Sequence, residues 1–458
     1  MANSEQLIAV LLSESQDQLA RELPLKLGIS QPSFSRLVKS TSNVVHYGSK
    51  LSKKYTIKDP KFGFDAIPIY QVDDEGRVSN FGTLYPVRGG RFVFEPMHGS
   101  NTVYDGLPWF IDYLRPQGFL GRRFPQQNPD LGLPDSINDW GDSDVVKALY
   151  FRGEDLPGNL IIGSESVARY LQKGTPTQAS RSDYPTLAIQ AISGEIPASS
   201  AAGEQPKFTC FDGHRHLIVK FSPVSSQSEI AQRWGDLLIC EYIANKVLFE
   251  AGIPSAKTVV FSERGRFFLE SERFDRTAKG RRAMVSLAAL DLEFIGFGSG
   301  WVRCVSELHK HQKVSGDTLI IVSVLEMFGK MIGNSDMHLG NLSFFADKGY
   351  KKFSIAPVYD MLPMYFAPTS QGEIVNKELK IPTPTPENIN CWTKAREIAE
   401  RFWKEVVLSE LISEDFKTIA QKNHFETQKL FCLSDLIVCN QCKCNPCRCN
   451  TVFRPAPE

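Results

Sequence analysis

The chain has 458 residues, 42% of them hydrophobic, and its 52 Lys and Arg residues balance 52 Asp and Glu residues. This composition excludes a fibrous or intrinsically disordered protein, and the length predicts two or three domains. No apolar run approaches the ~18 residues of a membrane span, and MANSEQLIAV lacks a signal-peptide pattern, so we expect a cytoplasmic protein without a membrane partner. None of the ten cysteines precedes Cys210 and six lie in the last 27 residues, which is not the spread of a disulfide framework.

Residues 1–59 are predicted to form a winged helix-turn-helix domain. Apolar residues recur at helical spacing in 4–12 and again in 16–27. Ser30 is then placed to cap a third helix, because a serine hydroxyl can accept a hydrogen bond from the first turn. The following VVHYGSKLSKKYTI predicts two short strands around a Gly-Ser turn, the wing of such a domain.

Positive charge is concentrated in this first domain. From Arg21 to Lys58 there are eight Lys and Arg residues and one acidic residue, Glu22. An anionic partner such as DNA is expected, with the third helix in the major groove and the wing against phosphates. The DNA-binding residues predicted in this way are Gln31, Ser33, Ser35, Arg36, Lys39, Lys50, Lys53 and Lys54. The alternative is a small helical domain that contacts another protein.

The remaining pattern predicts an α+β chain with a β-rich part before a helical part, the order of a two-lobed protein kinase. Residues 60–125 are expected to form a small β subdomain, and the stretch 115–144, dense in Pro, Gly, Asn and Asp, is expected to be a connection. Residues 126–275 are predicted to form the kinase-like N-lobe, with a strand in TLAIQAI at 186–192. Helical periods dominate 276–422, the predicted C-lobe.

Residues 423–458 are a cysteine-rich tail. The run CNQCKCNPCRCN contains the pairs Cys439/Cys442 and Cys444/Cys447, and paired C-x2-C thiolates can hold Zn²⁺. These pairs are unusually close together for a zinc ribbon. A disordered or appended segment is therefore the favoured interpretation, with a zinc site as the alternative.

Five polar residues in kinase order predict phosphoryl transfer, which needs a cation and a metal on the phosphates and a carboxylate near the attacking hydroxyl. Lys220 ends the apolar strand HLIVK, as the lysine of V-A-I-K does in protein kinases, and Glu241 lies in the next helix, where it could pair with that lysine. Asp336 and Asn341 have the D-x4-N spacing of a kinase catalytic loop. Asp360 ends a strand-like run, as the metal-binding aspartate of kinases does. ATP and Mg²⁺ are the cofactors expected for this set.

Several longer segments then carry a family resemblance. They are SSAAGEQPK at 199–207, LIVKF at 217–221, CEYIANKVLFEAGIP at 240–254, ERFDR at 272–276, IGNSDMHLGNLSFF at 332–345 and APVYDML at 356–362. With them, the chain from about residue 66 to 411 resembles the HipA family of serine/threonine kinases, the toxins of bacterial toxin–antitoxin pairs. The resemblance implies a growth-inhibiting protein kinase, a protein substrate such as an aminoacyl-tRNA synthetase or another translation component, and a separate helix-turn-helix antitoxin.

The resemblance also implies roles for single residues. Asp336 becomes the catalytic base, with Asn341 and Asp360 as Mg²⁺ ligands. The implied ATP-binding residues are Lys220, Glu241, Glu272 and Phe274, together with a phosphate loop of Ala201, Ala202, Gly203, Glu204 and Gln205. Ser200 aligns with the serine whose autophosphorylation silences the kinase; its alternative is a polar residue in a flexible linker.

Two departures from the family bear on function. SLAALDLEFIGFGSG, at 286–300, stands where the family has an H-Q-E-D-F-type segment, so we expect a different substrate choice. Gly340 occupies a position that is often basic in the family, which would weaken phosphate contacts.

Three functions therefore stay open. They are an active serine/threonine kinase toxin with a DNA-binding domain, a DNA-binding transcription regulator whose kinase-like domain is inactive or only binds nucleotide, and a small-molecule kinase. Retention of Lys220, Asp336, Asn341 and Asp360 favours an active enzyme, and the HipA-like segments favour a protein substrate.

Overall fold

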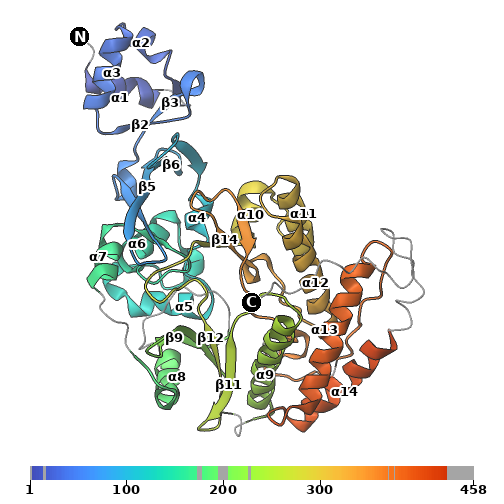
Figure 1. The fold of residues 1–458 in the computed structure, drawn as a ribbon. Helices are drawn as coiled ribbons and strands as arrows, with labels where there is room; N and C mark the ends of the chain where they lie inside the picture. The colour runs from blue at the N-terminus through green and yellow to red at the C-terminus, as the bar shows by residue number, and fades with distance from the viewer. Residues whose placement is uncertain are drawn as a thin grey trace.

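The computed structural model describes residues 3–13, 17–172, 178–193, 205–224, 228–369, 371–375 and 377–430. Figure 1 shows a small first domain that projects from one end of a larger two-lobed body. The described ranges contain four sheets, of three, five, four and three strands. Within those ranges, no helix combines the length and the apolar character needed to cross a lipid bilayer.

The first domain has three helices followed by an antiparallel hairpin. Its elements are α1 (Ser4–Ser13), β1 (Gln18–Leu19), α2 (Leu23–Lys26), α3 (Gln31–Ser40), β2 (Val44–Tyr47), a 3₁₀ turn (Lys50–Ser52) and β3 (Lys54–Ile57). Ser30 caps α3 as predicted, by accepting a hydrogen bond from the Ser33 N–H at 3.4 Å. The long helix expected over 16–27 is wrong: Gln18 pairs with Tyr55 of β3, so only the short α2 remains.

A buried carboxylate attaches this domain to the next one. Asp17, whose side chain is 1% exposed, accepts hydrogen bonds from Arg91 at 2.7 and 3.0 Å and from Tyr47 at 2.8 Å. Arg88 forms a further ion pair with Asp17 at 3.3 Å and donates to the Leu11 carbonyl at 2.6 Å. Burial by itself raises the pKa of Asp17, but the hydrogen bonds from Arg91 and Tyr47 outweigh burial and lower this pKa to about 2.

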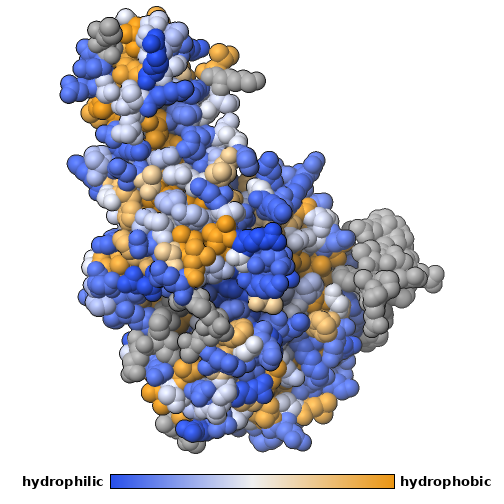
Figure 2. All heavy atoms as spheres, turned by 60° about the vertical axis from the view of Figure 1, so that its left-hand side comes forward, coloured by the Kyte–Doolittle hydropathy of each residue, from blue (hydrophilic) through white to orange (hydrophobic). Residues whose placement is uncertain are grey.

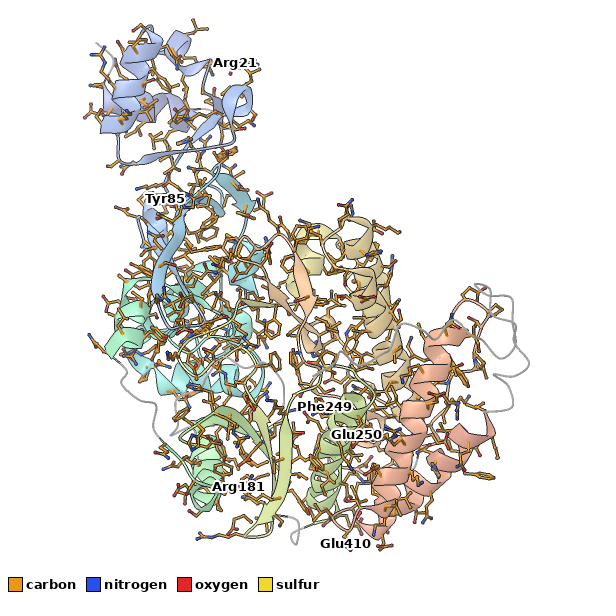
Figure 3. All side chains as sticks on the ribbon, viewed as in Figure 1. Arg21, Tyr85, Arg181, Phe249, Glu250 and Glu410 are labelled. Carbon is orange, nitrogen blue, oxygen red and sulfur yellow. The ribbon has the colours of Figure 1, made fainter. Side chains whose placement is uncertain are left out.

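Apolar and aromatic contacts continue the junction. Val45 of β2 packs with Val87 and Val93 of the following sheet. The Lys58 ammonium lies 5.1 Å from the ring centroid of Tyr85, which Figure 3 labels at the neck between the first domain and the body. The wing hairpin is therefore packed against the second domain along one side.

The second domain is built on the five-stranded antiparallel sheet, ordered β7-β6-β5-β4-β8. Its elements are β4 (Ile67–Val72), β5 (Val78–Val87), β6 (Arg91–Pro96), β7 (Thr102–Asp105), α4 (Trp109–Asp112), α5 (Gly118–Gln127), α6 (Asp142–Arg152), β8 (Leu160–Ile162) and α7 (Ser164–Gln172). Residues 115–144 thus include helices rather than connection alone. The predicted boundary at residue 125 falls inside α5, and because β8 pairs with β4, residues up to 172 belong with this sheet and not with the N-lobe.

The N-lobe carries a four-stranded antiparallel sheet, ordered β11-β12-β10-β9. Its elements are α8 (Tyr184–Ser193), β9 (Lys207–Phe211), β10 (His216–Phe221), α9 (Glu229–Glu250), β11 (Thr258–Glu263) and β12 (Arg266–Glu272). The strand predicted at 186–192 is wrong, since this segment is α8. Tyr184 and Ala188, one helical turn apart, are both buried in the sheet's cluster of phenylalanines, whereas Ile189 and Ile192 are exposed.

The C-lobe is mainly helical, as predicted. Its elements are β13 (Met284–Ser286), α10 (Leu287–Phe294), α11 (Trp301–Lys310), α12 (Gly316–Ile332), β14 (Ser343–Ala346), β15 (Phe353–Ile355), α13 (Ile389–Leu408) and α14 (Glu414–Lys429). Trp301, Trp392 and Trp403 are among its largest fully buried side chains. One hydrophobic cluster runs from β4 through α9 to α14, so the second domain and both lobes share a continuous core.

Asp17→Asn tests the junction of the first domain. Because the folded pKa of about 2 lies below the ordinary 3.8, the carboxylate's stabilisation is complete above about pH 4 and is lost as pH falls toward 2, a change of roughly 2 kcal/mol. We expect Asp17→Asn to abolish this pH dependence and to lower the opening free energy of β2 and β3, measured by hydrogen exchange, by about 3–5 kcal/mol. Glu22→Gln, which removes only the exposed 3.9 Å pair with Arg21, should change it by less than about 1 kcal/mol. Equal effects of the two variants would contradict the assignment.

Candidate functional site

A buried cluster of ionic groups lies between the two lobes. The Lys220 ammonium on β10 contacts both carboxylate oxygens of Glu241 on α9, at 2.7 Å each, and also the carboxylate of Asp360. The three side chains are 9%, 2% and 19% exposed, in that order. The structure therefore brings together three predicted site residues from segments up to 140 positions apart.

The electrostatics of this cluster follow from burial and pairing. Burial lowers the pKa of Lys220, but Asp360 and Glu241 offset this and the net shift is upward. Burial raises the pKa of Asp360, whereas Lys220 and then Lys207 lower it overall. Glu241, with Asp360 beside it, keeps a raised pKa mainly because it is buried. At neutral pH Lys220 is thus a fixed positive charge held on a strand, as a phosphate-binding group requires.

Lys207 is a further cation that the sequence analysis did not single out. It lies on β9 directly opposite Lys220 in the strand register and is buried. Directly opposed residues of an antiparallel pair share a face of the sheet. The face of the N-lobe sheet that presents Lys220 therefore carries two lysines.

The predicted catalytic loop follows the end of α12. Gly333, with φ +78°, ends the helix, and the chain turns so that Asp336 is exposed. Buried Asn341 donates from its side-chain amide to the Asp336 carbonyl at 2.8 Å, which closes the loop. The Asn334 amide joins this loop to Asp360 by accepting from the Asp336 N–H at 3.0 Å and donating to the Asp360 carbonyl at 3.2 Å. Asn334 was not predicted as a site residue, although it stands within the segment IGNSDMHLGN.

The oxygen donors near this loop suit a hard divalent cation. Because the Asn341 amide nitrogen already donates to the loop, its oxygen is the atom left for a ligand, and Asp360 supplies a carboxylate. Mg²⁺ prefers oxygen ligands and is commonly held by one or two protein groups together with phosphates. The described ranges, this site included, contain no group of three or more His, Cys, Asp and Glu residues arranged to hold a metal ion, so an ion here would depend on the Asn341 oxygen and on phosphate oxygens as well as on Asp360.

The His338 ring explains why a glycine, and not a basic residue, stands at position 340. The His338 ring nitrogen accepts the Gly340 N–H at 3.0 Å, and a Cβ at position 340 would lie 2.8 Å from the same ring. A basic side chain there would displace His338. The loop is held further by Trp301, whose indole N–H donates to the His338 carbonyl at 3.0 Å, and by the Tyr359 hydroxyl, which donates to the Gly340 carbonyl at 3.0 Å.

The glycine-rich segment 295–300 lies between α10 and Trp301, next to this loop. It is organised by the buried Asp291 carboxylate, which accepts the Phe297 N–H at 3.0 Å and the Gly298 N–H at 2.8 Å. The Arg303 guanidinium stacks 3.9 Å from the centroid of the Phe297 ring. The segment 286–300, predicted to differ from the family, therefore ends in an ordered turn that adjoins Trp301, which bonds to the loop at His338.

The segment 272–276, which we call the hinge, begins with Glu272 at the end of β12 and includes Phe274, two of the residues expected to bind ATP. The Phe274 ring lies 6.1 Å from Phe345 and 5.8 Å from Tyr359, beside the end of the Asp360 segment, and the Glu272 N–H donates to the Lys257 carbonyl at 3.0 Å. Arg273, Asp275 and Arg276, which lie between and after these two residues, form an ion network with the second domain.

This network, like Lys207 and Asn334, was not predicted from the sequence. Arg273 pairs with Asp155 at 2.9 Å and with Asp275 at 3.1 Å. Arg276 pairs with the same carboxylates at 2.8 and 2.6 Å. Burial raises the pKa of Asp275, but Arg273 and Arg276 outweigh it and lower the pKa to about 2. ERFDR therefore fixes the second domain against the hinge.

The predicted DNA-binding residues are placed unequally. Exposed side chains on α3 belong to Gln31, Ser35, Arg36 and Lys39. The Ser33 hydroxyl lies 3.0 Å from that of Ser30 and so belongs to the helix cap. Lys53 and Lys54 are half-buried in the wing. Apolar atoms also reach the surface of this domain (Figure 2), where Leu25 and Leu51 are more than four-fifths exposed at 82% and 83%.

Some predicted residues lie outside the described ranges. They are Ser200, Ala201, Ala202, Gly203, Glu204, the tail cysteines and the side chain of Lys50. Gln205 is described, and its side-chain amide donates to the Phe221 carbonyl at 3.4 Å, at the end of the strand that carries Lys220.

Asp275→Asn tests the hinge network. The substitution leaves two buried guanidinium groups with one carboxylate, and we expect a loss of about 3–5 kcal/mol in the free energy of unfolding in urea. Asp130→Asn is the control, because Asp130 forms a 2.7 Å pair with Arg152 but is 59% exposed, and should cost less than about 1 kcal/mol. An Asp275→Asn protein as stable as the control would refute the role of the network.

Two family profiles match the chain. Residues 64–171 match the family described as YjjJ-like toxin, middle domain, and residues 199–422 match the HipA-like C-terminal domain. Among curated proteins, Toxin YjjJ of Escherichia coli (strain K12) is 37% identical over 417 residues, which are 88% of this chain and 93% of the relative. Among solved structures, a chain of the Shewanella oneidensis MR-1 toxin–antitoxin complex of HipA, HipB and operator DNA is similar in fold, with a TM-score of 0.53 and 15% identity over 80% of this chain and 96% of that chain. This chain therefore belongs to the family of HipA-like toxins.

Proposed function

We propose that the protein is an ATP- and Mg²⁺-dependent serine/threonine protein kinase of the HipA toxin type. The observation that carries the proposal is the buried contact of Lys220 with Glu241 and Asp360, joined through Asn334 to the loop that bears Asp336. A strand-borne lysine, a helix-borne glutamate and two aspartates in this order are the parts that phosphoryl transfer from ATP requires.

Each residue has a defined task in this reaction. Lys220 neutralises phosphate oxygens, and Glu241 keeps the ammonium in place because it contacts it through both carboxylate oxygens. Exposed Asp336 accepts the proton of the attacking hydroxyl and orients that hydroxyl toward the phosphate. Asp360 and Asn341 would hold Mg²⁺, which when bound neutralises charge on the phosphates. Phe274 and the backbone near Glu272 would border the adenine.

The substrate is proposed to be a seryl or threonyl side chain of a protein. The ordered segment 295–300, which adjoins Trp301 and through it the loop at His338, is proposed to contact the incoming protein chain. A translation component such as an aminoacyl-tRNA synthetase is the class that the family suggests. Autophosphorylation at Ser200 is proposed on the same basis, as a means of silencing the kinase by charge in the phosphate loop.

Labelled ATP with Mg²⁺ tests this proposal directly. We expect the protein to phosphorylate itself at Ser200, and Asp336→Ala to lower the rate by about 10²–10⁴-fold because the general base is lost. Lys220→Met should weaken ATP binding, whereas Asp65→Ala, at an exposed aspartate outside the site, should have no effect. Ser200→Ala should abolish phosphate incorporation at that position and leave transfer to another protein intact. A protein that binds no nucleotide would instead favour a DNA-binding regulator with an inactive kinase fold.

We also propose that the first domain binds DNA through α3 and the wing. The supporting observation is the exposure of Gln31, Ser35, Arg36 and Lys39 on one helix of a domain rich in positive charge. In the solved relative, HipA occurs in a complex with HipB and operator DNA. Here the DNA-binding element would be part of the toxin chain itself, and a separate helix-turn-helix antitoxin remains a proposed further partner.

Fluorescence anisotropy with DNA from the protein's own promoter tests this second function. We expect Arg36→Ala and Lys39→Ala each to weaken DNA binding. Loss of a contact to a base should cost about 1–3 kcal/mol, and loss of a contact to a phosphate should lower the slope of log affinity against log salt concentration by about one. Arg77→Ala is the control, because it removes an arginine that is 78% exposed in the second domain. Binding that survives deletion of residues 1–58 would exclude this domain as the DNA-binding element.

A further inference from the structure

We propose that Asn334 is the positioning residue that holds the catalytic base and the metal-binding aspartate in register. The inference rests on the function proposed above, and it assigns Asn334 a role through Asp336 and Asp360 rather than contact with substrate.

The geometry shows one side-chain amide shared by two backbone segments. The Asn334 oxygen accepts the Asp336 N–H at 3.0 Å, and its nitrogen donates to the Asp360 carbonyl at 3.2 Å. The two segments are otherwise 24 positions apart, from residue 336 to residue 360. Asn334 itself is 5% exposed, so water cannot readily replace either bond.

The backbone of Asn334 is anchored to the end of α12. The Asn334 N–H donates to the Gly329 carbonyl at 2.8 Å, immediately after the helix ends at Gly333. Gly333 in turn accepts the Tyr365 N–H at 2.9 Å. The side chain therefore begins from a rigid helix end, and its reach to Asp336 and Asp360 transfers that rigidity to both residues.

Asp360 needs such support for a conformational reason. Its φ of +55° is rare for a residue with a side chain, and such a backbone persists only where surrounding contacts hold it. Its N–H lies 3.3 Å from Glu241 and its carbonyl is held by Asn334. The two contacts fix the peptide groups on both sides of the carboxylate that faces Lys220.

The chemistry selects asparagine over similar side chains. Position 334 must accept one hydrogen bond and donate another, which alanine cannot do and which a carboxylate can do only in part. Asn334→Asp keeps the size and the acceptor but points an oxygen at the Asp360 carbonyl. Asn334→Ala removes both bonds and leaves the Asp336 N–H and the Asp360 carbonyl without this partner.

The test compares Asn334→Ala and Asn334→Asp with a matched control, Asn423→Ala. Asn423 is also buried and donates to a backbone carbonyl, that of Ile419, at 3.0 Å within α14, away from the site. Three quantities are measured on the full chain: kcat, the Mg²⁺ concentration for half-maximal rate, and affinity for ATP without Mg²⁺. Hydrogen exchange of the segment 335–342 reports the loop itself.

Both Asn334 variants should lower kcat by about 10²-fold, the usual effect of a small misplacement of reacting groups. They should also need more Mg²⁺ and exchange faster in 335–342, while Mg²⁺-free ATP affinity stays unchanged because Lys220 and Glu241 are intact. Asn423→Ala should lose stability only. If the wild-type protein transfers phosphate and the Asn334 variants keep its kcat and Mg²⁺ dependence, this inference alone is overturned. If the wild-type protein transfers no phosphate, the proposed function is overturned.

Discussion

The structure depends on the buried contact of Lys220 with Glu241 and Asp360. An isolated charge in a protein interior is costly, and removing one partner of a buried pair is typically more damaging than the pair is stabilising. The three groups come from β10, α9 and the segment after β15, so each restrains where the other two elements lie. The N-lobe sheet, the long helix and the C-lobe meet at one point because these charges must be paired there.

Ion pairs with buried partners also join the other domains of the molecule. Asp17 receives Arg88 and Arg91 where the first domain meets the second, and Asp155 with Asp275 receives Arg273 and Arg276 where the second domain meets the hinge. At the first junction a buried carboxylate faces two arginines from a distant segment, and at the second two buried arginines face the carboxylate of Asp155 from a distant segment. Charged groups need specific geometry to compensate their desolvation, so these contacts fix orientation more strictly than apolar surfaces alone.

Local features were predictable and distant pairings were not. The Ser30 cap and α12 follow from nearby residues, and the order of Lys220, Glu241, Asp336 and Asp360 follows from spacings within short motifs. The strand predicted at 186–192 is a helix because an apolar run fits a buried strand and a sheet-covering helix equally well. The pairing of β8 with β4, and of Asp155 with the arginines of ERFDR, joins segments about ninety to one hundred and twenty positions apart and leaves no local pattern in the chain.

The three ionic junctions also constrain how one end of the chain can influence the other. A rotation of the first domain away from the second must separate Asp17 from Arg88 and Arg91, and breaking a buried pair costs about 3–5 kcal/mol. Coupling energies between sites in regulated proteins are typically about 1–3 kcal/mol, which is less than one such opening. Motion confined to segments that lie outside these ion pairs avoids that cost. Regulation of the site is therefore more easily achieved by local changes near Lys220 than by reorientation of the first domain.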